Sequence, residues 1–320
     1  MLYAILKTYV RLGMFIFARK IKVSHPKLLQ SDAPFMLAMN HPNSFLDAIL
    51  MDILFKVPIW SLARGDVFKG KRVIQFLTAV RILPVYRSSE GNDNLGENYK
   101  TFDSCITKFR QGEAVLIFSE GLCINEWHLR PLKKGTARLA TKAWDENVPM
   151  YVLPVGINYN SFRLFGKNVF INIGNPIHKN LIEVYDTDGK KNMVFNQALK
   201  AELNQLVFEI DANDTAKKQE MLTVPVPVWK KILLAIPALL GLIIHAPFFI
   251  PVKNFVTKKA GKTDHYDSVF LGISLITYPL YVLLLTIILV LAFSCSWFWL
   301  ALLLIPFTAF SYVQLSKQLD

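Results

Sequence analysis

The last hundred residues constrain the fold of this chain more than any other feature. After Val224 the sequence is almost continuously apolar, with blocks at 232–251, 269–293 and 297–313. A helix needs about 20 apolar residues to cross a bilayer. The second block is long enough, and the third is of marginal length but could cross the bilayer in the opposite direction. The sequence therefore predicts a C-terminal membrane region at 223–320; the alternative is a soluble apolar subdomain.

The first apolar block differs from the other two. Pro237, His245 and Pro247 interrupt it, which is unfavourable for a straight spanning helix. Lysines flank it on both sides, and lysines stay on the cytoplasmic side of a membrane. We therefore expect 232–251 to be re-entrant or in-plane and 269–313 to be a transmembrane hairpin. This topology predicts a cytoplasmic (inner) membrane protein whose remaining domain faces the cytoplasm.

The N-terminus and the overall charge also point to a bilayer. Residues 1–24 are apolar but are interrupted by Lys7 and Arg11, which predicts an interfacial helix, with a buried core helix as the alternative. The formal net charge of +12 predicts an anionic partner, and the apolar tail favours a lipid surface over nucleic acid. The three cysteines are far apart and form no metal or disulfide pattern.

Residues 25–222 alternate apolar strand-like runs with amphipathic helical runs. This alternation predicts an α/β fold in which helices cover both faces of a sheet. The expected strands are 34–40, 57–63, 82–87, 113–121, 149–159 and 168–174, and the expected helices are 44–55, 71–80, 99–112, 133–146 and 192–210.

The stretch "AMNHPNSFLDAIL" holds the first candidate site. His41 follows a strand and is kept in a loop by Pro42, and Asp47 lies one turn inside the next helix. A carboxylate that accepts from one ring nitrogen of a histidine lets the other nitrogen take a proton from a hydroxyl. The same two residues would also fit a purely structural pair that caps a helix.

Two further segments carry polar groups at the ends of expected strands. Glu120 and Gly121 end the strand at 113–121, and ligands gather at the carboxyl ends of parallel strands. The following "RPLKKG" presents Arg130, Lys133 and Lys134 as an anion clamp, although lysines at a solvated helix start are the alternative. Arg87 directly follows a short strand and, alone, fits an ordinary surface residue.

Four segments in this order, "NHPNSFLD", "LPVYR", "FSEG" and "YVLPVG", resemble the glycerol-phosphate acyltransferase superfamily, which includes the lysophosphatidate acyltransferases. The resemblance covers roughly residues 30–180. It implies the glycerolipid acyltransferase fold, a mixed and mostly parallel sheet with flanking helices. It also implies transfer of a fatty acyl group from acyl-CoA or acyl carrier protein to an acceptor hydroxyl, with no cofactor and no metal.

The resemblance assigns roles by position. His41 would be the general base and Asp47 its orienting partner. The residues assigned to substrate binding are Asn40, Arg87, Glu120, Gly121, Arg130 and Lys133. Three departures bear on the acceptor: the His–Asp spacing is one residue longer than usual, Ser119 replaces a proline, and Leu122-Cys123 replace a Thr-Arg pair that would bind phosphate.

These observations predict a membrane-bound O-acyltransferase of phospholipid biosynthesis. The preferred acceptor is 1-acylglycerol 3-phosphate, because an amphiphilic acceptor suits a site at a bilayer surface. Glycerol 3-phosphate and an aminoacyl lipid are alternative acceptors. A non-enzymatic protein that binds anionic lipid is the alternative from another class, and it would lose nothing in His41→Ala.

Overall fold

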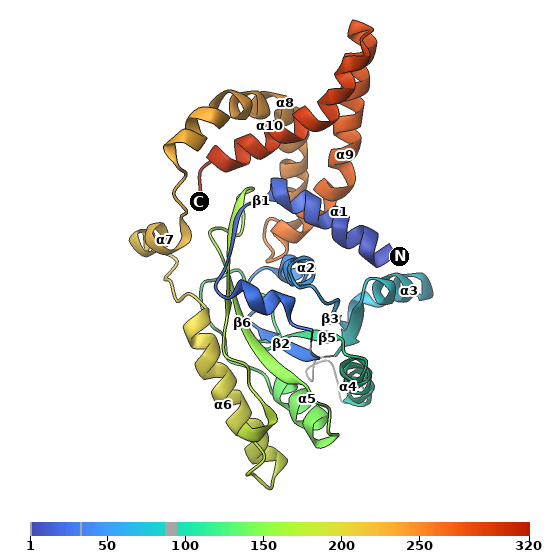
Figure 1. The fold of residues 1–320 in the computed structure, drawn as a ribbon, viewed down its shortest axis with the longest axis vertical. Coiled ribbons are helices and arrows are strands. Elements are labelled where there is room, and N and C mark those ends of the chain that lie inside the picture. Colours follow the sequence, from blue (N-terminus) through green and yellow to red (C-terminus); the bar gives the residue numbers. More distant parts are fainter. Residues whose placement is uncertain (1, 33, 87–94) are drawn as a thin grey trace.

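A seven-stranded sheet forms the centre of the molecule, with strand order β1-β7-β6-β2-β5-β3-β4 (Figure 1). The computed structural model describes residues 2–32, 34–86 and 95–320. β6 and β7 are antiparallel and the other neighbouring pairs are parallel, so the predicted mixed, mostly parallel sheet is confirmed. The strands are β1 (Ala18–Val23), β2 (Phe35–Met39), β3 (Ile59–Arg64), β4 (Ile82–Val85), β5 (Ala114–Phe118), β6 (Tyr151–Tyr159) and β7 (Lys167–Ile173).

Helices cover both faces of this sheet, as the alternation of apolar runs predicted. Every residue of the central strand β2 is buried, because a parallel strand covered on both sides has no solvent face. Alternate side chains of β2 enter two separate cores, with Met36 on one face and Leu37 on the other. The first core is completed by α4 (Leu95–Arg110), α5 (Lys134–Asp145) and α6 (Asp188–Leu206), and the second by α1 (Leu2–Phe17) and α2 (Ser44–Leu54). The shorter helix α3 (Lys71–Ala79) packs beside β4.

The end of the predicted N-terminal helix is a strand. Helix α1 ends at Phe17, and Ala18–Val23 forms β1 at the edge of the sheet, parallel to β7. The exposed side chains of Lys20 and Lys22 alternate with less exposed apolar ones, which is the period of a strand. The predicted helix over 1–24 is therefore wrong in its last third, and the sheet begins at residue 18.

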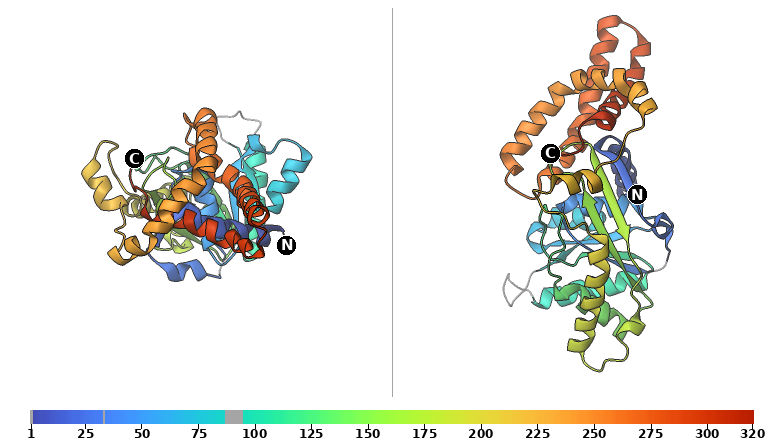
Figure 2. Two further views of the ribbon diagram at one scale, coloured as in Figure 1. Left: turned by 90° about the horizontal axis from the view of Figure 1, so that it is seen from above. Right: turned by 90° about the vertical axis from the view of Figure 1, so that its left-hand side faces the viewer.

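The C-terminal region extends from one end of the sheet domain and makes the molecule elongated (Figure 2). In the described part of the chain, three helical segments are long and apolar enough to cross a membrane: α8 (Val228–Ala260), α9 (Tyr266–Phe293) and Ser296–Leu315, which contains α10 (Ala301–Leu315). α9 runs away from the sheet and α10 returns toward it (Figure 1). This course matches the hairpin expected at 269–313, whose insertion into a bilayer stays a prediction.

The first apolar block is not interrupted by a break in the helix. It lies inside α8, one helix of 33 residues that continues through Pro237, Pro247 and Pro251. The helix is bent rather than straight (Figures 1 and 2), as internal prolines require. Both expectations for this block, a re-entrant segment and an in-plane helix, stay predictions. The preceding polar segment contains a short helix, α7 (Thr215–Leu222).

Candidate active site

The site forms where two neighbouring parallel strands end. Met39 of β2 pairs with Phe118 of β5, and the amide of Ser119 donates to the Met39 carbonyl at 2.8 Å. The residues that follow the two strands therefore lie side by side. The backbone N–H of His41 donates to Oε2 of Glu120 at 2.7 Å, although the two residues are 79 positions apart.

His41 and Asp47 are in the contact that their spacing predicted. Nδ1 of His41 lies 2.9 Å from Oδ2 of Asp47, whose side chain is fully buried in the first turn of α2. The amide of Asn43 donates to the same oxygen at 2.8 Å, and the hydroxyl of Tyr159 donates to Oδ1 at 2.6 Å. Three donors thus stabilise a charge that would be costly in an apolar environment.

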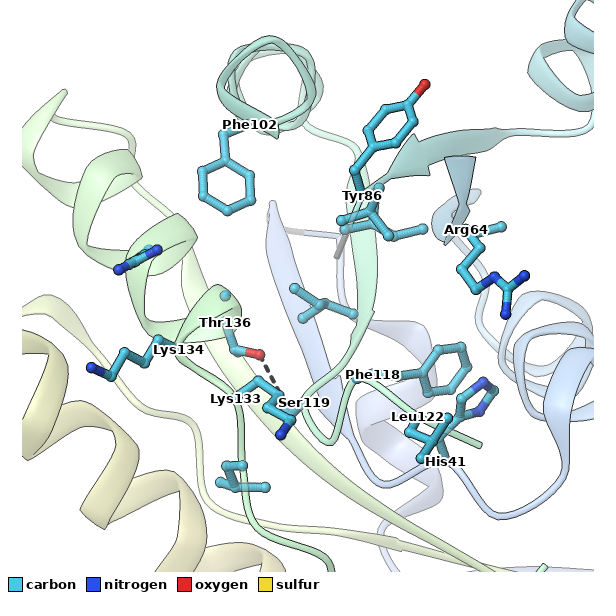
Figure 3. Close-up of a pocket in the computed structure, with 18 of the residues that line it drawn as sticks. His41, Arg64, Tyr86, Phe102, Phe118, Ser119, Leu122, Lys133, Lys134 and Thr136 are labelled. Atoms are coloured by element: carbon cyan, nitrogen blue, oxygen red, sulfur yellow. Dashed lines mark hydrogen bonds between the residues drawn. The ribbon is translucent and has the colours of Figure 1, made fainter. Parts of the chain in front are cut away.

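The other edge of the His41 ring faces the cavity. The ring stacks on Phe118, with centroids 3.6 Å apart and planes 14° apart (Figure 3). Within the described residues Nε2 has no hydrogen-bond partner. Because the carboxylate of Asp47 fixes the proton on Nδ1, Nε2 carries the lone pair that could accept a proton. The contact is confirmed, and the general-base role stays a prediction.

Two neighbouring groups remain protonated donors. Burial, and then the nearby Asp47 charge, raises the pKa of Tyr159 well above its ordinary value of 10. The same two causes, in the same order, raise the pKa of the Cys123 thiol. Cys123 stands where many superfamily members carry an arginine, and here its Sγ lies 2.9 Å from the amide of Ser44. It therefore shapes the start of α2 instead of supplying a phosphate ligand.

Glu120, predicted to bind the acceptor, joins two loops. Its side chain is buried, and its other oxygen, Oε1, accepts from the backbone N–H of Arg130 at 2.8 Å. Burial raises its pKa to about 7, although the two amide donors, from Arg130 and His41, oppose this shift. In this geometry Glu120 positions the backbone on both sides of the cavity.

Gly121 and Lys133 line the cavity, and their role in substrate binding stays a prediction. Gly121 has a φ of +67°, which a side chain would strain, and a Cβ there would lie 3.0 Å from Cγ of Lys133. The amide of Lys133 donates to the carbonyl of Ser119 at 2.7 Å, and the Ser119 hydroxyl accepts from Thr136 (Figure 3). These bonds hold the start of α5 against the end of β5.

The remaining predicted binding residues lie elsewhere. Arg130 is half-buried and pairs with Glu126 at 3.0 Å; the next residue, Pro131, lines the cavity, whereas Arg130 itself does not. The Asn40 side chain is buried and exchanges two hydrogen bonds with the backbone of Ile157 in β6, so it ties the loop to the sheet instead of facing a substrate. Arg87 lies outside the described residues.

A large open cavity, of about 2370 Å³, extends from His41 between the sheet and the start of α5 (Figure 3). One part of its wall is apolar, including Leu62, Phe102 and Phe118. Cationic side chains line it as well: Arg64, Lys133, Lys134, Arg138, Lys142 and Lys200. Such a cavity has room for both an acyl chain and an anionic group beside the imidazole.

Sequence reasoning missed two contributors to the site. Tyr159 lies 112 residues from Asp47, and the only hint was a tyrosine at the end of a strand that is otherwise apolar. The turn between α8 and α9 also reaches the site, where Asp264 and His265 line the cavity. An aspartate at the start of a long apolar helix, Asp267, was the available signal.

Comparison with known proteins agrees with the motifs. The family model described as Acyltransferase matches residues 20–158. A 1-acyl-sn-glycerol-3-phosphate acyltransferase of Bacillus subtilis (strain 168) is 25% identical over 192 residues, which cover 60% of this chain and 88% of the relative. Among solved structures, the chain is similar to the 1-acyl-sn-glycerophosphate acyltransferase PlsC of Thermotoga maritima, with 17% identity and a TM-score of 0.44 over 64% of this chain and 79% of that one.

The matched region contains the strand ends, His41, Asp47, Glu120 and Gly121. The resemblance to the superfamily that the four motifs indicated is therefore confirmed. Residues 20–158 therefore match the acyltransferase family, and the chain is an acyltransferase.

Proposed function

We propose that this acyltransferase moves a fatty acyl group from acyl-CoA or acyl carrier protein to the free hydroxyl of 1-acylglycerol 3-phosphate. The observation that carries the proposal is the His41–Asp47–Tyr159 chain of hydrogen bonds, which ends at a cavity with both apolar and cationic walls. The Bacillus relative, named for the same acceptor, supports this choice.

The chemistry follows from the orientation of the imidazole. Nε2 of His41 takes the proton of the acceptor hydroxyl while its oxygen attacks the carbonyl carbon of the thioester. A carbon–oxygen bond forms, the carbon–sulfur bond breaks, and the proton passes from the imidazolium to the departing sulfur. Asp47 stabilises the positive charge on the ring between these steps, and the Tyr159 hydroxyl keeps its carboxylate oriented.

The phosphate of the acceptor would bind among the cations of the cavity. Lys133 is the best placed of the predicted residues, because it lines the cavity and lies next to Gly121. Gly121 and Glu120 both follow the end of β5. Lys134 and Arg138 follow it at the start of α5 and line the cavity as well. A phosphate there would also benefit from the partial positive charge at the start of this helix.

The course of the C-terminal helices supports a location on one face of a membrane. The start of α8 is tied to the domain through Lys230, which donates to Gln314, whose amide donates to the Arg19 carbonyl. Its end is tied through Arg163, which donates to the Gly261 carbonyl. Both ends of α8 therefore lie on the side of the catalytic domain, which favours an in-plane α8 and a spanning α9–α10 hairpin, with the domain in the cytoplasm.

Helix α1 adds an apolar face to this arrangement. Its cations point inward: Lys7 and Arg11 donate to the carbonyls of Phe55 and Ile53, where α2 ends. Its outer face exposes a stripe of large apolar residues, Leu2, Ile5, Tyr9, Leu12 and Phe15. We propose that this stripe lies in the interface of the bilayer, as a helix with one apolar face does.

A transfer assay with the full-length protein in vesicles tests the proposal. Labelled acyl-CoA and acyl carrier protein are each offered with 1-acylglycerol 3-phosphate, glycerol 3-phosphate and an aminoacyl lipid. We expect transfer to 1-acylglycerol 3-phosphate, and a fall in kcat of roughly 100-fold or more in His41→Ala, the usual contribution of a general base. Transfer only to another acceptor, or full activity in His41→Ala, would refute it.

A further inference from the structure

The turn between α8 and α9 (residues 261–265) and the first turn of α9 are packed into the active site from outside the region that matches the family model. Asp267 is 2% exposed, and its carboxylate accepts from Nδ2 of Asn43 at 2.8 Å and from Nζ of Lys167 at 2.6 Å. The hydroxyl of Ser268 accepts from the amide of Leu46 at 3.2 Å. Two adjacent residues of the C-terminal region thus hold the segment between His41 and Asp47.

The same turn also holds the second loop of the site. Oδ1 of Asp264 accepts from the amide of Asn125 at 3.0 Å. The side chain of Asn125 in turn donates to the carbonyl of Pro42 at 2.7 Å. The loop after β2, the loop after β5 and the α8–α9 turn are therefore joined in one network.

Ser44 belongs to this network and has a strained backbone conformation. Its φ is +50°, a left-handed conformation that non-glycine residues rarely adopt and that persists only where its surroundings enforce it. Its amide donates to Sγ of Cys123 at 2.9 Å, and its hydroxyl lies 2.8 Å from Nδ1 of His265. The conformation of Ser44 sets the direction in which α2 leaves the loop, and hence where Asp47 stands.

We propose that the α8–α9 turn is a positioning element of the active site and that His265 is the residue through which it holds Ser44. His265 thereby fixes the start of α2 so that Asp47 meets Nδ1 of His41. This inference rests on the proposed roles of His41 and Asp47. It makes the C-terminal region a part of the catalytic machinery as well as an anchor.

His265 permits a clean test because it is exposed, so its replacement leaves the packed core intact. In the full-length protein in vesicles, we expect His265→Ala to lower kcat about 5- to 10-fold, the loss of one hydrogen bond of about 1 kcal/mol. The KM for acyl-CoA should stay unchanged, and the midpoint of thermal unfolding should fall by no more than about 4 °C. His265→Asn, whose amide can replace the Nδ1 contact, should restore kcat to within about 2-fold of the wild type.

Two further variants make the result specific. If His265 acts through Ser44, the kcat of the double variant Ser44→Ala/His265→Ala should be no lower than that of Ser44→Ala alone. Both substitutions then remove the same hydrogen bond, so their effects on kcat do not add. The control is His178→Ala, which should keep wild-type kcat. His178 is exposed, lies beside Tyr151 at the start of β6 and does not line the cavity.

An unchanged kcat in His265→Ala, a loss that His265→Asn fails to repair, or losses that add in the double variant would each overturn the proposal. These outcomes are distinguishable from failure of the proposed function. If the proposed function were wrong, the wild type would not acylate 1-acylglycerol 3-phosphate, or His41→Ala would stay active.

Discussion

Asp47 is the residue on which the site depends most directly. Its fully buried carboxylate receives hydrogen bonds from a backbone amide, an imidazole and a phenol. A charge in such a place is stable only while each of its partners is present, because removal of one partner costs about 1–3 kcal/mol. That is a large fraction of the about 5–15 kcal/mol that stabilises a domain.

Tyr159→Phe removes one of these donors and changes little else. We expect it to destabilise the protein by about 1–3 kcal/mol, because Oδ1 of Asp47 is left without its partner. The measurement is denaturant unfolding in detergent. Tyr151→Phe, at the opposite end of the same strand, is the matched control and should change stability by less than about 0.5 kcal/mol. Equal effects of the two variants would contradict this account of Asp47.

Sequence distance decided which site residues were predictable. His41 and Asp47 are six residues apart, and a loop followed by the first turn of a helix fixes their separation locally. Tyr159 and Asp267 reach the same place only through the order of the strands and the packing of the C-terminal helices. No local pattern encodes either contact, so these two partners of the network could not be assigned from sequence.

At the scale of elements, Glu120 connects the ends of β2 and β5 to the segment that leads into α5. Each of its two oxygens accepts one backbone N–H, which orients the loops on both sides of the cavity. Because this connection is made by the buried carboxyl group of Glu120, the stability of the fold depends on pH.

Between pH 4.5 and about 7, the folded chain keeps on Glu120 a proton that the unfolded chain releases, because burial raises the pKa of this carboxyl from 4.5 to about 7. The unfolded state then binds fewer protons, so stability falls as pH rises through this window, by at most about 3 kcal/mol. Glu120→Gln should flatten this part of the profile when thermal unfolding is followed from pH 4 to 8. Glu183→Gln, an exposed carboxylate, should retain the wild-type slope.

The elements themselves were largely predictable, and the exceptions have physical causes. Apolar runs of strand length, separated by helical runs, located β2 to β7 and the helices between them. β1 was missed because its charged residues follow an apolar helix without a break, and they read as the end of that helix. The prolines of α8 suggested an interruption, whereas a long apolar helix can bend around them and remain continuous.

At the scale of the whole molecule, most of the large exposed apolar residues belong to α1 and the C-terminal helices. The exposed stripe of α1 lies on the helix that packs against α2, α9 and α10, next to the C-terminal helices (Figure 1). The sheet domain thus has one end suited to lipid, and the active site stands close to it through the α8–α9 turn.

Charges placed on the α1 stripe should therefore weaken use of acceptor in a membrane. Leu12 and Phe15 are 61% and 64% exposed, so Leu12→Glu/Phe15→Glu should leave the fold intact. We expect the KM for 1-acylglycerol 3-phosphate in vesicles to rise about 10-fold, since burial of one such side chain contributes about 1.5–3 kcal/mol.

The KM for a short-chain acceptor dispersed in detergent should not change in this variant. Val184→Glu places the same charge at a 76% exposed position of the sheet domain and serves as the control. A similar rise in KM for both forms of the acceptor would show that α1 acts on the site rather than on the bilayer.

The α8–α9 turn joins two apolar helices and also touches the loop that carries His41. In the membrane arrangement that we propose, the lipid around the helices and the lipid that is being made would contact opposite ends of these few residues. A change in bilayer thickness that tilts α9 would therefore reach the reacting centre without a separate regulatory domain. The activity of the enzyme would then depend on the thickness of the bilayer whose lipids it helps to make.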